Sequence, residues 1–275
     1  MISLKTSLKK KETKVKMNKK IKSGDFSLLY ESYSKFRPDY SEDVLVKLLK
    51  LVKKKTAEIE FVDVGAGTGI WTRMVYNKGV GNTIAFEPNN NMRKQGEIDS
   101  INTKIKWENG KAENIDIKEN SCDLLTMASS FHWADFDSSI KEFYRVLKPG
   151  GRFALLWNPR NFENNLTLVE IENYLKKLKP KIKRVSSGKS GITLNLSAKI
   201  NNTNLFDDII FLEGHHTIKM SVDRYIGIWN SVNDVRYQLG DEYENFINFI
   251  KDKLKDLDFI ECDYLTRCWT GLTKK

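Results

Sequence analysis

The chain has 275 residues, 40% of them hydrophobic, which is enough to build a sizeable core. Its net charge is +10, but nine lysines set against one glutamate within residues 1–22 account for +8 of it. The rest of the sequence is nearly neutral, which argues against a basic nucleic-acid-binding surface, and it holds no run of about 18 apolar residues that could span a membrane.

The lysine-rich segment predicts a basic, disordered arm over residues 1–22, followed by a single domain over residues 23–275. Tethering of the arm to anionic lipid or nucleic acid is the alternative interpretation. The cysteines are odd in number and lack metal-ligand spacing, so we expect free thiols in a reducing compartment, the cytoplasm. These are Cys122, Cys262 and Cys268. No metal site is predicted.

An amphipathic helix over residues 43–53, with Ser41 as its N-cap, opens the predicted fold. Strands and helices then alternate. We expect strands at 59–64, 83–87, 103–108, 122–127 and 152–157, and helices at 70–78, 90–97 and 136–147. Such alternation predicts a parallel sheet that is covered by helices on both faces.

The pattern changes after residue 158. Residues 159–205 are rich in Asn, Lys and Ser and contain one helical segment at 166–178, which is typical of a lid inserted into a compact domain. The chain then returns to regular structure. We expect a strand at 209–220, helices at 222–231 and 242–257, and a last strand at 259–272.

Residues 61–70 read Phe-Val-Asp-Val-Gly-Ala-Gly-Thr-Gly-Ile, which predicts a buried strand, a tight turn and the start of a helix. A dinucleotide-binding loop has the spacing G-x-G-x-x-G, whereas the third glycine here, Gly69, comes one residue early. Asp63 precedes the loop; an acid there would repel a phosphate but can accept hydrogen bonds from an ammonium group. The segment therefore favours S-adenosylmethionine, a cationic nucleoside that carries an amino acid.

Further motifs lie before and after this loop. They are Tyr30, Tyr33, Phe36, Arg37, Pro38 and Tyr40 upstream; Glu87, Pro88 and Met92 after the second strand; Lys111 to Asn114 after the third; and Ala128 to Trp133 after the fourth. In this order they resemble the class I S-adenosylmethionine-dependent methyltransferases. Within that superfamily the chain is similar to the small-molecule, trans-aconitate methyltransferase-like branch, methyltransferase type 11. The resemblance covers residues 26–158 well and residues 206–272 loosely.

The resemblance implies a Rossmann-like α/β fold. Its parts are a seven-stranded, mostly parallel sheet with an antiparallel last strand, helices on both faces, an N-terminal helical segment and an inserted lid over residues 159–205. It also implies the cofactor S-adenosylmethionine, with S-adenosylhomocysteine as the product. The implied cofactor-binding residues are Tyr33, Arg37, Asp63, Gly65, Ala66, Gly67, Glu87, Pro88, Met92, Ala112, Glu113 and Ser129.

Several of these residues have a role with a physical basis. The glycines let the backbone pass beside the methionine part of the cofactor, and the carboxylate of Glu87 can accept both ribose hydroxyls. Arg37 could pair with the carboxylate of the cofactor, or it could be an ordinary surface residue. Met92 is implied to form part of the adenine wall, although its helical spacing also fits the core. In this branch a Gln often stands where the chain has Ser129.

His132 is the only histidine near the proposed chemistry, and its ordinary pKa suits either a general base or a residue that orients the acceptor. Aromatic side chains could form a pocket for the acceptor, although such residues are equally often plain core. The candidate substrate-pocket residues are Tyr30, Phe131, Trp133, Trp157, Asn158, Tyr225 and Trp229.

These patterns predict a methyltransferase that acts on a small molecule, with oxygen of a carboxylate or hydroxyl as the expected acceptor. One alternative is methylation of RNA or protein with the help of the basic arm. The fourth strand is followed by Ser-Ser-Phe-His rather than by N-P-P-Y or D-P-P-Y, which argues against base amino methylation. A second alternative is a protein that binds the cofactor without catalysis. The sequence leaves the acceptor and the oligomeric state open.

Overall fold

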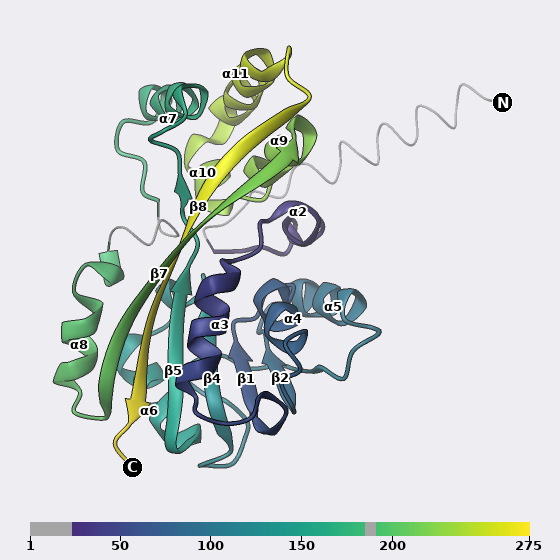
Figure 1. The fold of residues 1–275 in the computed structure, drawn as a ribbon. Helices are drawn as coiled ribbons and strands as arrows, with labels where there is room; N and C mark the ends of the chain where they lie inside the picture. The colour runs from purple at the N-terminus through teal and green to yellow at the C-terminus, as the bar shows by residue number, and fades with distance from the viewer. Residues whose placement is uncertain (1–23, 185–190) are drawn as a thin grey trace.

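The computed structural model describes residues 24–184 and 191–275 (Figure 1). The strands are β1 (Phe61–Val64), β2 (Thr83–Phe86), β3 (Lys106–Glu108), β4 (Cys122–Ala128), β5 (Leu147–Trp157), β6 (Arg160–Asn161), β7 (Phe206–Ser221) and β8 (Phe259–Thr273). In this part of the chain they form one sheet in the order β3-β2-β1-β4-β5-β8-β7, and the short β6 also pairs with β8. The predicted arm and residues 185–190 of the predicted lid lie outside the described residues.

The direction of the strands follows the prediction. Neighbouring strands from β3 to β5 are parallel, whereas β8 runs antiparallel to β5, β6 and β7. The Rossmann-like, mostly parallel sheet with an antiparallel last strand is therefore confirmed. The parallel order places the carboxyl ends of β1, β2 and β4 at one edge of the sheet, where the loops rich in polar residues begin.

The helices are α2 (Tyr30–Phe36), α3 (Glu42–Leu51), α4 (Ile70–Tyr76), α5 (Asn90–Asp99), α6 (Phe136–Val146), α7 (Leu166–Leu178), α8 (Leu196–Asn202), α9 (Val222–Asn230), α10 (Asn233–Leu239) and α11 (Tyr243–Leu254). The hydroxyl of Ser41 accepts a hydrogen bond from the Val44 N–H, so the predicted N-cap of α3 is confirmed. None of the helices between residues 24 and 184 or between 191 and 275 has both the length and the apolarity needed to cross a membrane.

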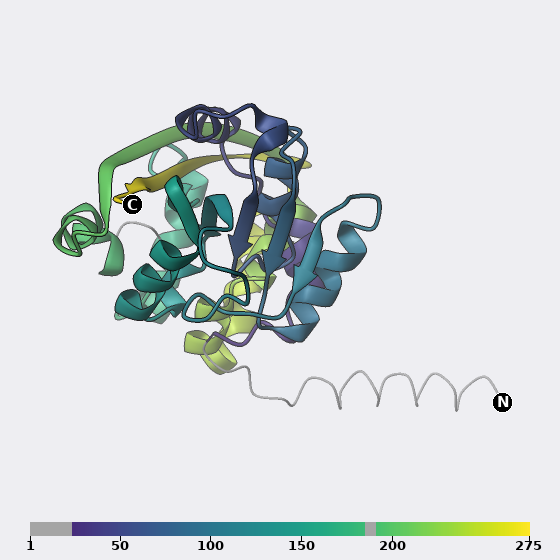
Figure 2. The same ribbon diagram turned by 90° about the horizontal axis from the view of Figure 1, so that it is seen from below.

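The two faces of the sheet bury alternate residues of the central strands. Leu124 of β4 packs with α3 and α4 in one hydrophobic cluster, whereas its neighbour Leu125 packs with α6 and α8 in another. Successive side chains of a strand point to opposite faces, so a strand buried on both sides needs apolar residues at every position. The opposite placement of α3 and α6 can be followed in Figure 2.

A third hydrophobic cluster lies beyond the sheet. The far ends of β7 and β8 extend past the other strands and carry α7, α9, α10 and α11, which gather above the sheet in Figure 1. We call these four helices, with the adjoining ends of β7 and β8, the cap. Within the segment predicted as a lid, α7 belongs to the cap, whereas α8 packs against the sheet. The predicted domain boundaries stay a prediction.

Candidate active site

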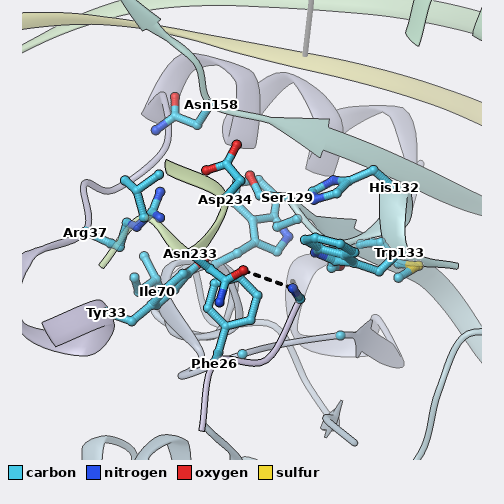
Figure 3. Close-up of a pocket in the computed structure, with 18 of the residues that line it drawn as sticks. Phe26, Tyr33, Arg37, Ile70, Ser129, His132, Trp133, Asn158, Asn233 and Asp234 are labelled. Atoms are coloured by element: carbon cyan, nitrogen blue, oxygen red, sulfur yellow. Dashed lines mark hydrogen bonds between the residues drawn. The ribbon is translucent and has the colours of Figure 1, made fainter. Parts of the chain in front are cut away.

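A cavity of about 680 Å³ lies where the loops after β1, β2 and β4 meet, the edge at which open α/β sheets bind ligands. Figure 3 shows side chains of the N-terminal segment, of the loop after β4 and of α10 around it. Most of the predicted site residues line the cavity: Tyr33, Arg37, Gly65, Ala66, Gly67, Glu87, Pro88, Met92, Ala112, Glu113, Ser129, His132, Trp133 and Asn158. The structure brings them together, and their roles stay predictions.

The glycine loop leaves room for a ligand because it has no side chains. Gly65 and Gly67 have φ values of 62° and 61°, a region that favours glycine. A Cβ atom on Gly65 would lie 2.7 Å from the Ser130 hydroxyl oxygen, and a Cβ atom on Gly67 would project towards Met92 and Tyr33. Any larger residue would therefore strain the loop and fill the cavity.

Glu87 lies at the end of β2, next to this loop. One oxygen of its carboxylate accepts a hydrogen bond from the Gly67 N–H, and the other accepts one from the Asn89 N–H, both at 2.8 Å. Burial raises the pKa of Glu87, and these two hydrogen bonds oppose that shift. Each carboxylate oxygen has a second lone pair, so the group can still accept from a pair of neighbouring hydroxyls.

Asp63 does not line the cavity, although the sequence predicts a cofactor contact. Its carboxylate is buried between β1, α4 and β4, where it accepts hydrogen bonds from the hydroxyls of Thr72 at 2.6 Å and Thr126 at 2.7 Å. Burial raises the pKa of Asp63 to about 7. The residue therefore fixes the position of the glycine loop from behind.

Five of the predicted substrate-pocket residues do not line the cavity. Phe131 is buried against Phe143 under the sheet. The Tyr30 hydroxyl donates a hydrogen bond to the exposed Glu31. Trp157 is also fully buried, and Tyr225 and Trp229 lie one layer behind Arg160, which covers both rings.

Residues 24–36, which we call the strap, lie over the cavity. The Gly24 N–H donates a hydrogen bond to the side-chain oxygen of Asn233 at 2.9 Å, drawn as a dashed line in Figure 3. Asn233 in turn donates to the Asp25 carbonyl at 2.9 Å. Phe26 packs edge-on against Trp133, with the ring centroids 6.4 Å apart. The strap is thus held both by the cap and by the loop after β4.

Arg37 continues from the strap and contacts the cap. Its guanidinium lies 4.8 Å above the ring of Tyr33 and donates hydrogen bonds to the hydroxyl of Ser231 at 2.8 Å and to the Ser231 carbonyl at 3.0 Å. Pairing of Arg37 with the carboxylate of a cofactor stays a prediction.

The strand end at Ser129 has an unusual backbone. Ser129 has a φ of 54°, which is uncommon for a residue other than glycine, and such conformations cluster at functional sites. Its hydroxyl accepts a hydrogen bond from Tyr40 at 2.9 Å, and burial raises the pKa of Tyr40, which keeps that donor protonated. The hydroxyl of Ser129 is therefore oriented by a neighbour.

His132 lines the cavity, and the protein already uses one of its ring nitrogens. The indole N–H of Trp157 donates a hydrogen bond to Nδ1 of His132 at 3.3 Å. Burial lowers the pKa of His132 to about 4, so the ring is neutral at physiological pH. A neutral imidazole that accepts at Nδ1 carries its proton at Nε2. The other ring nitrogen is therefore a hydrogen-bond donor rather than a base.

The far end of the cavity holds charged residues that the sequence analysis did not identify. They are Arg160, Glu163, Glu172, Lys176, Arg184 and Asp234. The only available signal was the position of Arg160, directly after the Trp157-Asn158-Pro159 step at the end of β5. The others come from α7, α10 and the segment after α7, whose approach to the sheet no local pattern indicates.

Comparisons with known proteins agree with this arrangement. A family described as a methyltransferase domain matches residues 62–155. An uncharacterized methyltransferase of Mycobacterium tuberculosis is 32% identical over 144 residues, which are 50% of this chain and 55% of that protein. A ubiquinone/menaquinone biosynthesis C-methyltransferase of Rubrivivax gelatinosus is 31% identical over 117 residues, 40% of this chain and 46% of that protein.

The fold has solved counterparts. The crystal structure of the YcgJ protein from Bacillus subtilis matches with a TM-score of 0.53 at 18% identity, over 86% of this chain and all of that one. The chain spans about half the length of the curated relatives it matches, and the trans-aconitate branch stays a prediction. Residues 62–155 therefore match a methyltransferase domain, and the chain is similar to the methyltransferases named above.

Proposed function

We propose that the protein transfers a methyl group from S-adenosylmethionine to a small molecule, at the oxygen of a carboxylate or hydroxyl. The observation that carries the proposal is a single cavity that runs from the glycine loop and Glu87 to a second compartment in the cap. This volume lies within the usual range of small-molecule sites, about 300 to 1,000 Å³. The similarity to a quinone-biosynthesis methyltransferase also supports a small acceptor.

The residues present fit the cofactor. The bare loop at Gly65 and Gly67 would accommodate its methionine part, Glu87 would hold the ribose hydroxyls, and Met92 and Ala112 would contact the adenine. The cofactor supplies an electrophilic methyl group on a positively charged sulfur. A methyl group so activated needs an aligned acceptor more than it needs an acid or a base.

The chain itself would contribute alignment and a dry site. The strap covers the cavity and is fixed at Asn233 and Trp133, so it can exclude water while both ligands are bound. His132 would donate a hydrogen bond from Nε2 to the acceptor and so orient it. Because Nδ1 is occupied by Trp157 and burial holds the pKa of His132 near 4, we assign it an orienting role.

This role predicts an unusual titration of His132. The folded pKa, about 4, lies below the ordinary value of 6.5, so the ring should stay neutral as the pH falls from 8 to 5. Proton NMR of the three histidines across that range would measure it, with His132→Gln used to assign the signal. A midpoint near the ordinary value for His132 would restore the general-base interpretation.

The proposed activity is tested in two steps. Calorimetric titration with S-adenosylhomocysteine should show binding to one site per chain, and transfer of a radiolabelled methyl group over a panel of small acids, phenols and alcohols should then identify the acceptor. We expect removal of residues 1–22 to leave both results unchanged, because the site residues named above all follow residue 23. A wild-type protein that binds neither the cofactor nor its product contradicts the proposal.

A further inference from the structure

The character of the cavity changes towards the cap. Three cationic side chains line the cavity at the end that adjoins α7. These are Arg160, Lys176 and Arg184; Glu172 of α7 lies beside Arg160 and Arg184, and Glu163 and Asp234 also line the cavity. Charged groups of both signs thus meet at this end of the cavity.

Arg160 is the most deeply buried of these cations. It comes from β6, and its side chain is only 10% exposed. The guanidinium lies over the rings of Tyr225 and Trp229, 4.8 and 4.7 Å from their centroids, and Nη1 donates a hydrogen bond to the Tyr225 hydroxyl at 3.1 Å. Two aromatic faces and one hydroxyl thus hold the guanidinium in place at the wall of the cavity.

The nearest carboxylate is shared with a second guanidinium. Glu172 accepts hydrogen bonds from Nη1 of Arg184 at 3.0 and 3.3 Å, whereas its closest oxygen lies 4.0 Å from Nη1 of Arg160, beyond hydrogen-bond distance. Among the described residues, the Nε atoms of Arg160 and Arg184 have no hydrogen-bond partner. One carboxylate therefore lies beside two guanidinium groups, of which only that of Arg160 is almost fully buried.

Such an arrangement is costly unless something else completes it. A charge removed from water needs a counter-ion and hydrogen bonds, and a planar guanidinium matches a carboxylate or phosphate group with two parallel hydrogen bonds. Lys176, four residues after Glu172 on α7, lines the same region and can reach an anion from the solvent side. An anionic ligand between Arg160 and Lys176 would give the Arg160 guanidinium an acceptor within hydrogen-bond distance, which Glu172 does not provide.

We propose that this end of the cavity is a subsite for an anionic group of the methyl acceptor, a carboxylate or a phosphate, and that Arg160 is its principal contact. The inference rests on the proposed function, because it places the acceptor in the same cavity as the cofactor. Tyr225, Trp229 and Glu172 are positioning residues that fix the guanidinium. Specificity would then come from the cap, and methyl transfer from the loops of the sheet.

The test uses simple probes with the full chain. Succinate, inorganic phosphate and the neutral dimethyl succinate are titrated into the protein by calorimetry, with and without saturating S-adenosylhomocysteine. We expect at least one of the two anions to bind and the diester not to bind. Tighter binding of succinate assigns a carboxylate, and tighter binding of phosphate assigns a phosphate group.

Variants connect the binding to the proposed residues. Arg160→Gln should weaken the anion about tenfold or more, because it removes a charged hydrogen-bond donor. Lys176→Gln, at an exposed position where folding is not at risk, should weaken it by a smaller factor. The matched control is Arg236→Gln, an arginine of the same cap that lies over Tyr243 and does not line the cavity.

Each outcome decides a separate point. The subsite is refuted if neither anion binds to the wild-type protein, if the diester binds as well as succinate, or if both cavity variants bind the anion as tightly as Arg236→Gln does. Failure of S-adenosylhomocysteine to bind would instead refute the proposed methyl transfer, and the titrations without it would still report on the anion site.

Discussion

Replacement of Glu87 by glutamine is expected to weaken S-adenosylhomocysteine binding by about 10- to 150-fold, the range that loss of a hydrogen bond to a charged group gives. The carboxylate accepts from the Gly67 and Asn89 N–H groups on its two oxygens and keeps one lone pair on each for the ribose. A glutamine amide presents one oxygen and one NH₂ group, so it cannot accept on both sides. Calorimetric titration measures the change.

The matched control is Glu108→Gln. Glu108 ends the neighbouring strand β3, is exposed and does not line the cavity, and it bonds to Glu87 only through its backbone carbonyl. We expect Glu108→Gln to bind S-adenosylhomocysteine with the affinity of the wild type. If Glu87→Gln also binds S-adenosylhomocysteine with an affinity within about threefold of the wild type, Glu87 has no part in holding the cofactor. The loss of a hydrogen bond to a charged group would weaken the affinity by more than about threefold.

Stability is expected to fall as the pH rises from about 4 to about 7 because of Asp63. The buried carboxyl has a folded pKa of about 7 against an ordinary value of 3.8. Between these two pKa values the folded state thus holds a proton that the unfolded state has already released. The resulting stabilisation of the folded state is complete below about pH 4 and is lost as the pH rises through about 7. The shift corresponds to a change on the order of 4 kcal/mol in the free energy of unfolding.

Asp63→Asn isolates this contribution in urea unfolding at pH 4.5 and pH 8. The amide stays neutral, so the variant should gain stability relative to the wild type at pH 8 and little or none at pH 4.5. Asp123→Asn is a control whose effect on the free energy of unfolding at pH 8 should have the opposite sign. Burial raises the pKa of Asp123, but hydrogen bonds from Lys54 and Lys148 outweigh it and lower the pKa. Its replacement should therefore cost stability at pH 8. Parallel pH dependence of the wild type and Asp63→Asn would show that Asp63 does not titrate in this range.

Local patterns were sufficient for the parallel strands of the sheet, whereas the antiparallel last strand and the roles of the cavity residues came from the family resemblance, and those roles stay predictions. Gly65, Gly67 and Gly69 all have a positive φ. Glycine favours this conformation, so the local sequence alone is enough to predict the turn. Glu87 and Ser129 could be located because each follows a buried strand, and parallel strands end at the same edge. These residues lie together in the structure because the order of the strands brings their loops together.

The cap half could not be predicted in the same way. The aromatic residues Tyr225 and Trp229 were expected to form a pocket wall, but Arg160, which precedes Tyr225 by 65 residues, lies between them and the cavity. Helix α10, which supplies Asn233, has no separate helical pattern long enough to be recognised. The placement of Asp63 behind the loop depends on hydroxyls of Thr72 and Thr126 from two other elements. Each of these features is a contact between distant segments.

The place of β8 in the sheet also has a consequence for biosynthesis. This strand, residues 259–273, lies between β5 and β7 in the sheet, and the ribosome synthesises both of these neighbouring strands before it synthesises β8. The edge of β5 that later pairs with β8 would therefore stay unpaired while the ribosome adds more than a hundred further residues. An unpaired strand edge can pair with another chain and so promotes aggregation. Release of residue 273 from the exit tunnel would thus be the event that completes the sheet, and a chain truncated before β8 should depend on chaperones to stay in solution.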